Sequence, residues 1–409
     1  MTTYVVEHPQ KGRIEYQDKK RWLWPSAICY SLLPLPIMAA FVLTGNPWLL
    51  IVPLEVLFIL VPVLDFIFGV DRTNPPEEIV PQLEADPYYK RLLFAMVPAQ
   101  FISLFAAAWL VATQDLSIGF FVAFAIMVGL IGGTSVNVAH EIGHKNNKLQ
   151  RLLARIVLAA TGYGHFCIEH NLGHHRDVST PADPASARMG ESLYRFMFRE
   201  IPGTLKRGWN AEANRLQRRG KNVWSRDNHI LQSYLMTLIF QGGLVIVFGW
   251  PLIVFFLIHN AAAWFQLTCA NYIEHYGLLR AVDENGRYEK CKPHHSWNAN
   301  HVVSNLLLFQ LQRHSDHHAH PARRYQSLRS FDQLPELPSG YFGMYLLAYV
   351  PALWFKVMDP KLMAIPHING DLDKVNIDPK RETEIRARWA MSKRTMTKKT
   401  VSDKAMSES

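Results

Sequence analysis

The sequence predicts an all-α protein, a bundle of six membrane-spanning helices with a histidine-rich cap on one side. Six apolar stretches are long enough for a bilayer, which a helix of about 20 mostly apolar residues can cross. The polar segments beside them hold most of the 18 histidines. Lys and Arg outnumber Asp and Glu by 43 to 34, and such a basic excess is typical of the cytoplasmic loops of multi-span proteins.

The six spans are expected at 22–41, 47–70, 92–113, 117–139, 230–249 and 250–273. Five of these stretches contain no Asp, Glu, Lys or Arg, and the second contains Glu55 and Asp65. Carboxylates inside a membrane usually face the bundle interior and are functional candidates. A structural role is favoured for Asp65, which lies near the end of its span. For Glu55 a structural and a functional role stay equally open.

The basic residues orient these spans. The connections around Gly45, 114–116 and Gly249 contain no Lys or Arg, whereas the N-terminus, the loop at 71–91 and the segment 145–221 are basic. When the spans alternate, all basic segments fall on one side, which the positive-inside rule assigns to the cytoplasm together with both termini. The polar start of the chain predicts no cleavable signal peptide.

Two shorter apolar runs complete the helical pattern. The runs at 152–168 and 341–358 contain charged residues, glycine or proline. They are shorter than the other apolar stretches, so we expect interfacial or buried helices there. The four cysteines include no CxxC pair, which excludes a zinc ribbon and a thioredoxin-like motif.

The chemical signal lies in four histidine motifs: HEIGH at 140–144, EHNLGHH at 169–175, NYIEHYG at 271–277 and HSDHHAH at 314–320. Residues three or four apart share a helix face, so such histidine pairs can hold one cation. Adjacent histidines point about 100° apart, so such a pair can serve two metals, or one metal and a supporting contact around it. The windows 140–144, 170–175 and 314–320 hold nine of the 18 histidines in 18 residues, where random placement would put about one. All four motifs are predicted on the same side of the membrane.

Nine histidines are candidate metal ligands, which exceeds the three or four of a single zinc site. Two metal ions with four or five imidazoles each are the simplest interpretation, although imidazole suits zinc, copper, iron and nickel alike. The candidates are His140, His144, His170, His174, His175, His275, His314, His317 and His318. Nearby carboxylates can fix the ring tautomers and offset the charge. We assign this supporting role to Glu141, Glu169, Glu274 and Asp316, with direct ligation by one of them as the alternative.

Four sequences, HEIGHK, EHNLGHHRDV, NYIEHYGLLR and LQRHSDHHAHP, resemble those of the bacterial membrane alkane 1-monooxygenases. These rubredoxin-dependent alkane hydroxylases belong to the membrane fatty acid desaturase/hydroxylase superfamily. The resemblance runs from about residue 22 to 379 and includes NPPEE, DPASARMGES and PHHSWNANH. The three histidine boxes are shared with membrane desaturases, whereas NYIEHYG and RHSDHHAHP are specific to alkane hydroxylases.

The resemblance implies two non-haem irons in a cytoplasmic diiron cap, held by the nine histidines. It implies that O2 hydroxylates the terminal methyl of medium-chain n-alkanes to give 1-alkanols. The electrons would come from NADH through rubredoxin reductase and rubredoxin. The implied location is the bacterial inner membrane, with lipid and no nucleic acid as a partner. The expected organisation is a cytoplasmic N-terminal segment (1–21), a transmembrane and cytoplasmic catalytic domain (22–379) and a mobile basic tail (380–409).

Several alternatives stay open. A xylene-type methyl monooxygenase and a membrane fatty acid desaturase/hydroxylase are the nearest ones. A metal transporter would place its ligands at mid-membrane, whereas these lie at span ends and in loops. Nine basic residues between 195 and 226 offer a surface either for an acidic rubredoxin or for lipid. They are Arg195, Arg199, Lys206, Arg207, Arg215, Arg218, Arg219, Lys221 and Arg226.

Overall fold

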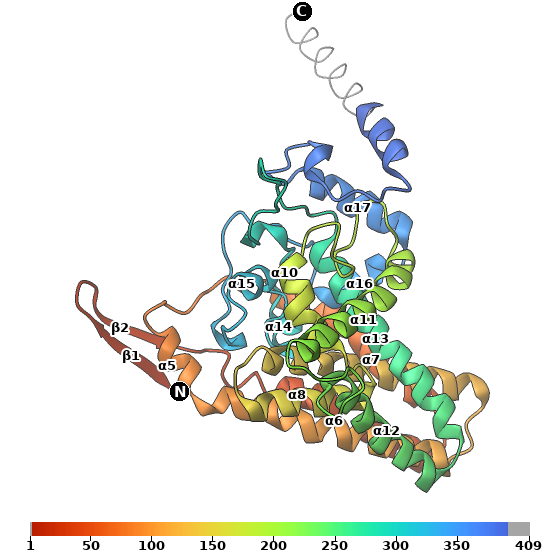
Figure 1. The fold of residues 1–409 in the computed structure, drawn as a ribbon. Helices are drawn as coiled ribbons and strands as arrows, with labels where there is room; N and C mark the ends of the chain where they lie inside the picture. Colours follow the sequence, from red (N-terminus) through yellow and green to blue (C-terminus); the bar gives the residue numbers. More distant parts are fainter. Residues whose placement is uncertain (1, 392–409) are drawn as a thin grey trace, which may run out of the picture.

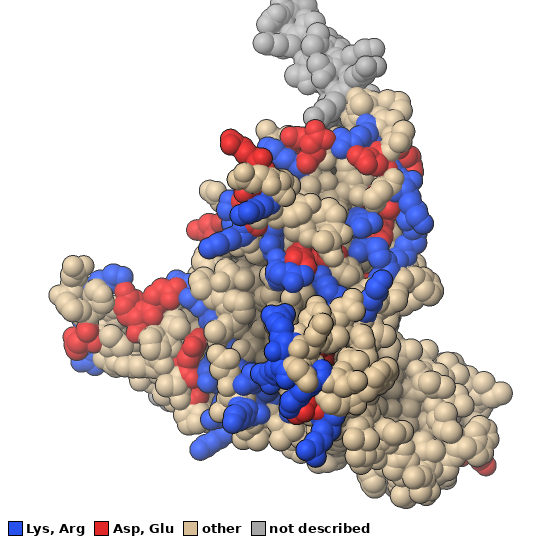
Figure 2. Space-filling model, in the orientation of Figure 1, with Lys and Arg blue, Asp and Glu red and all other residues tan. Residues whose placement is uncertain are grey.

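The computed structural model describes residues 2–391, and these residues are mainly helical, as predicted. Among them, six helical segments are long and apolar enough to cross a membrane, so the chain is a multi-pass membrane protein. They are Ser26–Thr44, Pro47–Phe68, Pro87–Thr113, Ile118–Gly143, His229–Phe248 and Pro251–His275. Figure 2 shows almost no charged side chain where the spans extend away from the cap, which fits a surface covered by lipid.

The spans are built from helices of different regularity. The first comprises α1 (Ser26–Leu32) and α2 (Pro34–Thr44). The second comprises η1 (Pro47–Ile51), α3 (Val52–Glu55), η2 (Val56–Leu60) and α4 (Val61–Phe68). The other four are single helices: α6 (Pro87–Thr113), α7 (Ile118–Gly143), α12 (His229–Phe248) and α13 (Pro251–His275). α7 and α13 run beyond the apolar residues that predicted them, so His140 and His275 lie in their last turns.

The helices α7 and α13 form the centre of the bundle, and glycine lets them pack closely. A Cβ atom on Gly129 would lie 2.4 Å from the His259 carbonyl oxygen, and one on Gly133 would lie 2.7 Å from Cβ of Gln266. Small residues permit such close approach between membrane helices. The close packing fixes the ends of both helices relative to each other. His259 is buried, and its Nδ1 lies 2.9 Å from Oδ1 of Asn260, so it is a hydrogen-bonded residue of the bundle core.

The two carboxylates of the second span differ in their surroundings. Asp65 is buried, and its Oδ1 accepts hydrogen bonds of 3.0 Å from the backbone N–H groups of both Val303 and Ser304. Asp65 thereby satisfies backbone N–H groups at the N-terminus of α14 (Val302–Leu307) and connects this helix to the second span. Glu55 is exposed on the outside of the bundle, so it does not face the interior as intramembrane carboxylates usually do.

The cap lies over the ends of α7 and α13 (Figure 1). The helix α8 (Lys148–Thr161) lies in the bundle, against α6, α7 and α12 (Figure 1). The longer helices of the cap are α11 (Leu193–Gln217), α16 (Tyr341–Ala348) and α17 (Pro351–Met363). Its shorter elements are α5 (Val80–Ala85), α9 (Phe166–Glu169), η3 (His170–His174), α10 (His175–Asp177), η4 (Pro293–His295), α15 (His314–Ala319), η5 (Tyr325–Ser327) and η6 (Leu372–Lys374). The run predicted at 341–358 is a helix pair bent by 120°, as expected from Pro351, which cannot continue a helix hydrogen bond.

The ends of the chain add features that the sequence did not predict. Strands β1 (Thr3–His8) and β2 (Gly12–Gln17) form an antiparallel hairpin that extends from the molecule (Figure 1). The predicted all-α fold did not include this hairpin. Residues 382–391 are helical, and Arg388 pairs with Asp359 at 2.7 Å. The rest of the tail predicted from 380 lies outside the described residues.

Candidate metal centre

The structure brings all nine candidate histidines together, although they come from four separate segments. They form two groups, in each of which the possible ligand atoms lie within 4.8 Å of one another. The five-histidine group comprises His140, His144, His170, His175 and His317. The four-histidine group comprises His174, His275, His314 and His318. The two groups adjoin, because the ring centroids of His175 and His318 are 4.4 Å apart. Each group could hold a metal ion.

The rings in both groups meet through their Nε2 atoms. In the five-histidine group, Nε2 of His317 lies 2.8 Å from Nε2 of His140 and 3.2 Å from Nε2 of His175. In the four-histidine group, Nε2 of His314 lies 3.1 Å from Nε2 of His275 and 2.9 Å from Nε2 of His318. Neutral nitrogens at such distances converge on the place where a cation would sit.

A π-helical turn decides how the second histidine box divides between the groups. The spacing predicted that His170 and His174 share one cation, and this prediction was wrong. In η3 the N–H of His175 bonds to the carbonyl of His170, five residues back. Residues five apart therefore align, and Nε2 of His170 lies 3.0 Å from Nε2 of His175 while His174 turns to the other group. π-helical turns are frequent at functional sites.

The other two boxes keep the spacing that a regular helix predicts. His140 and His144 share the five-histidine group, and His314 and His318 share the four-histidine group. The i,i+3 spacing predicted that His317 shares a cation with His314, and this prediction was wrong, because His317 joins the five-histidine group. Each adjacent pair of histidines is split between the two groups, which is one of the two arrangements open to residues about 100° apart on a helix.

The electrostatic environment favours the neutral form of six of these imidazoles. Burial, followed by the neighbouring rings, lowers the pKa well below the usual histidine value at six positions outside the spans. These are His144, His170, His175, His314, His317 and His318. A neutral imidazole offers a lone pair, which is the form that binds a metal. Within the described residues, the buried Nε2 atoms of His144 and His174 have no hydrogen-bond partner, as suits a metal ligand. The residues therefore fit two metals.

A carboxylate that the sequence analysis missed orients one ring. Oδ2 of Asp183 lies 2.9 Å from Nδ1 of His174, and both side chains are buried. Burial would raise the pKa of Asp183, but His174 and Arg207 outweigh it and hold the pKa well below the usual range. Arg207 of α11 also pairs with Glu169, whose pKa burial raises to about 8. Asp183 begins DPASARMGES, and only its place in that motif could have drawn attention to it.

The four carboxylates assigned a supporting role differ in their contacts. Oε2 of Glu274 lies 3.3 Å from Nε2 of His314, on the inner side of the four-histidine group. Glu169 reaches His174 only through Arg207 and Asp183. Glu141 pairs with Lys145 at 3.1 Å, and Asp316 pairs with His320 at 2.9 Å and with Arg323 at 3.2 Å.

A third cluster is less suited to a metal. Glu289, His294 and His295 bring their polar atoms within 4.8 Å of one another. However, Nδ1 of His295 accepts a 3.0 Å hydrogen bond from the Lys292 backbone N–H. A neutral ring then carries its proton on Nε2, which lies 3.3 Å from Glu289, so His295 has no lone pair left for a cation.

A second buried carboxylate lies behind the centre. Glu200 of α11 accepts hydrogen bonds from Thr268 Oγ1 at 2.7 Å and Asn271 Nδ2 at 3.1 Å, both on α13. Burial raises the pKa of Glu200 to about 7. The sequence pattern drew no attention to Glu200, because it lies in a polar helix without metal-ligand spacing.

Comparison with known proteins identifies the family. The fatty acid desaturase family matches residues 115–350. An alkane 1-monooxygenase of Ectopseudomonas oleovorans is 51% identical over 91% of this chain and 92% of its own length. Alkane 1-monooxygenase 1 of Alcanivorax borkumensis is 49% identical over 93% of this chain and 94% of its own length. The chain belongs to the alkane 1-monooxygenases of the fatty acid desaturase family. The xylene/toluene monooxygenase hydroxylase component of Pseudomonas putida is a more distant relative, 30% identical over 57% of this chain and 62% of its own length.

Proposed function

We propose that this protein hydroxylates the terminal methyl group of medium-chain n-alkanes to 1-alkanols with O2. One oxygen atom enters the substrate, and the other leaves as water with two electrons and two protons. One observation carries the proposal: nine imidazoles form two adjoining groups in a chain about half identical to alkane 1-monooxygenases over nearly its whole length. The relatives are named for this activity, and we assign the same activity to this chain.

The proposed cofactor is a pair of non-haem irons. The five-histidine group would hold one iron and the four-histidine group the other, each through Nε2. When bound, the irons supply the reduction of O2 and the oxidising power needed to attack an unactivated C–H bond. The protein's own part is to keep the rings neutral, fix their tautomers and exclude water.

The surroundings of the centre suit a substrate without polar groups. A small cavity of about 20 Å³ adjoins both histidine groups, and Phe166, Leu267, Ala270 and Leu311 contribute apolar side chains to its wall. An alkane can be bound only through apolar shape. Between the spans, an almost wholly apolar groove of about 700 Å³ opens to the lipid side. It is lined by Phe58, Ile126, Leu130, Leu257, Phe265 and Tyr349, among others. Both features favour an alkane that arrives from the bilayer.

We also infer the orientation and the electron donor. The basic segments favour the bacterial inner membrane, with both termini and the cap in the cytoplasm. Reporter fusions after Leu116 and Lys221 should then report periplasm and cytoplasm, respectively, and the reverse result would contradict the orientation. A cytoplasmic cap would let rubredoxin, reduced by an NADH-dependent reductase, dock near the irons.

The basic residues of α11 and the following loop divide into two sets. Five have acidic partners: Arg195, Arg199, Arg207, Arg215 and Lys221. Within the described residues, the other four are exposed and form no ion pair: Lys206, Arg218, Arg219 and Arg226. Figure 2 shows basic side chains gathered on this face of the molecule. The unpaired cations are the ones available to an acidic carrier.

Product analysis tests the proposed activity. The purified protein, supplied with O2, rubredoxin, rubredoxin reductase and NADH, should convert octane to 1-octanol. It should prefer octane to p-xylene and to an 18-carbon acyl substrate. His174→Ala is the inactive control, since its Nε2 is a proposed iron ligand. A preference for p-xylene, or formation of a double bond in the acyl chain, would instead support the xylene-type or desaturase alternative.

A further inference from the structure

Two rings of the four-histidine group have their protons fixed by their outer partners. Nδ1 of His174 faces the Asp183 carboxylate at 2.9 Å, and Nδ1 of His275 faces the backbone carbonyl of His295 at 3.2 Å. An ionised carboxylate and a carbonyl can only accept a hydrogen bond. Each Nδ1 therefore carries the proton, and each Nε2 keeps its lone pair for a metal.

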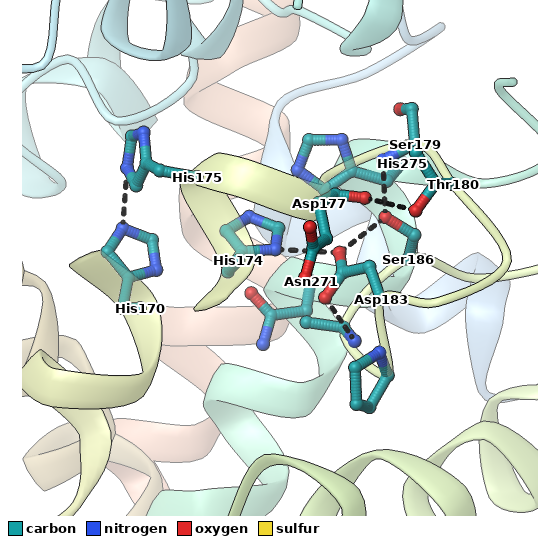
Figure 3. Close-up of polar contacts among 12 residues, drawn as sticks. His170, His174, His175, Asp177, Ser179, Thr180, Asp183, Ser186, Asn271 and His275 are labelled. Atoms are coloured by element: carbon teal, nitrogen blue, oxygen red, sulfur yellow. Dashed lines mark hydrogen bonds and ion pairs between the residues drawn. The ribbon is translucent and has the colours of Figure 1, made fainter. Parts of the chain in front are cut away.

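The two acceptors are connected to each other by a pair of buried serines. Ser186 Oγ donates to Asp183 Oδ2 at 2.6 Å and accepts from the backbone N–H of Ser179 at 2.8 Å. Ser179 Oγ in turn donates to the His295 carbonyl at 2.8 Å. We call Asp183, Ser186, Ser179 and the His295 carbonyl the serine bridge. It joins His174 to His275, two rings that lie 101 residues apart in sequence. Figure 3 shows the part of this bridge that runs from His174 through Asp183 and Ser186 to Ser179.

The backbone of Ser179 is held in an unusual conformation. Its φ is 56°, in the left-handed region that residues other than glycine seldom adopt. Its carbonyl accepts a 2.9 Å hydrogen bond from the Arg280 N–H, which holds the turn from the other side. Glycine would adopt this conformation without steric strain. What serine adds at this position is the hydroxyl that reaches the His295 carbonyl, and strained residues of this kind gather at functional sites.

We propose that Ser179 is a positioning residue for the metal of the four-histidine group. Through the serine bridge it fixes His174 and His275 together, in the Nδ1-protonated form that ligates through Nε2. Without the Ser179 hydroxyl, the His295 carbonyl that faces His275 Nδ1 loses one of its two donors and is held less firmly in place. The five-histidine group has no member on the bridge. The inference rests on the proposed metal centre, and it names a residue that acts on one metal only.

The test is a comparison of iron retention in Ser179→Ala, Ser179→Gly and Ser186→Ala. Loss of an outer partner of a metal-binding histidine typically weakens metal affinity by 10-fold to 100-fold. In each variant, ferrozine should therefore remove one of the two irons at a roughly 10-fold to 100-fold lower concentration, and the other iron at the wild-type concentration. Thr180→Val is the matched control, since its buried hydroxyl donates to the Asp177 carbonyl at 2.7 Å, outside the bridge. This variant should keep both irons as the wild type does.

The outcomes separate this inference from the proposed function. Wild-type retention of both irons in the Ser179 and Ser186 variants would overturn the inference, and octane hydroxylation would be unaffected. If one iron were lost more easily from Ser179→Ala but not from Ser179→Gly, the effect would come from backbone strain, and the inference would also be overturned. If both irons were lost equally easily, Ser179 would not act on the four-histidine group alone, and the inference would be overturned. A wild-type protein that binds no iron would overturn the proposed function itself.

Discussion

The substitution Gly129→Ala tests whether close packing of α7 against α13 holds the metal centre together. The added Cβ would lie 2.4 Å from the His259 carbonyl oxygen and 2.7 Å from Cβ of Ala262. Ordinary van der Waals contact begins at 3.4 Å, so the two helices must separate or rotate by about 1 Å, as in other overpacked cores. Both obstructing atoms belong to backbone or to a short side chain and cannot turn away.

The magnitude follows from two opposing effects. Overpacking typically destabilises by about 1–3 kcal/mol, and the higher helix propensity of alanine returns up to about 1 kcal/mol. The displacement also reaches the centre, because His140 lies 11 residues further along α7, about 16 Å at 1.5 Å per residue. Metal sites require ligand placement within about 0.5 Å. We therefore expect a lower melting temperature and a loss of bound iron.

The assay is thermal unfolding in detergent together with iron analysis, beside the matched variant Gly243→Ala. A Cβ on Gly243, in α12, would meet no atom within 4 Å. This control should retain its iron and melt at the wild-type temperature or slightly above. If Gly129→Ala matched the control in both measurements, the argument from helix packing would be refuted.

Three further predictions concern single side chains. His275→Lys removes a lone pair and supplies the positive charge that a helix C-terminus favours, so iron should fall to the share of the five-histidine group. His320→Lys, outside both groups, should keep its iron. Because burial raises the pKa of Glu200 from 4.5 to about 7, the folded chain binds a proton that the unfolded chain releases, and stability should fall by about 3 kcal/mol as the pH rises from 4.5 through 7. Glu200→Gln should remove this loss, so its melting temperature should rise relative to the wild type over that window; a difference independent of pH would contradict the assignment. The double substitution Arg218→Glu and Arg219→Glu should raise the KM for rubredoxin, and the increase should be larger at low salt. Turnover with a chemical reductant should not change. An unchanged KM would place the docking surface elsewhere.

The spans and the histidine motifs could be predicted because they depend on local sequence. Uninterrupted apolar runs set the helix positions, and only their ends shifted, where polar residues such as His140 extend a helix beyond its apolar part. The division of ligands between the groups was predicted in part. The i,i+4 pairs in α7 and α15 are regular helix geometry, whereas the π-helical turn that pairs His170 with His175 leaves no pattern in the sequence.

The supporting residues could not be predicted for a different reason. Asp183, Ser186 and Ser179 act from an irregular loop, where contacts depend on backbone conformation and not on periodic spacing. Glu200 lies on a polar helix and reaches the centre only because α11 packs against α13. The N-terminal hairpin was missed because its two strands are short and partly polar, beside a much stronger apolar signal.

The most direct test of the whole account is a single turnover by protein purified without oxygen. Iron should be counted first, and the reduced protein should then receive octane and ¹⁸O2. The two histidine groups predict two irons per chain, and the proposed function predicts 1-octanol that carries ¹⁸O, with no product from a sample stripped of iron. Unlabelled 1-octanol, oxidation at an internal carbon, or full turnover by the stripped protein would contradict the account.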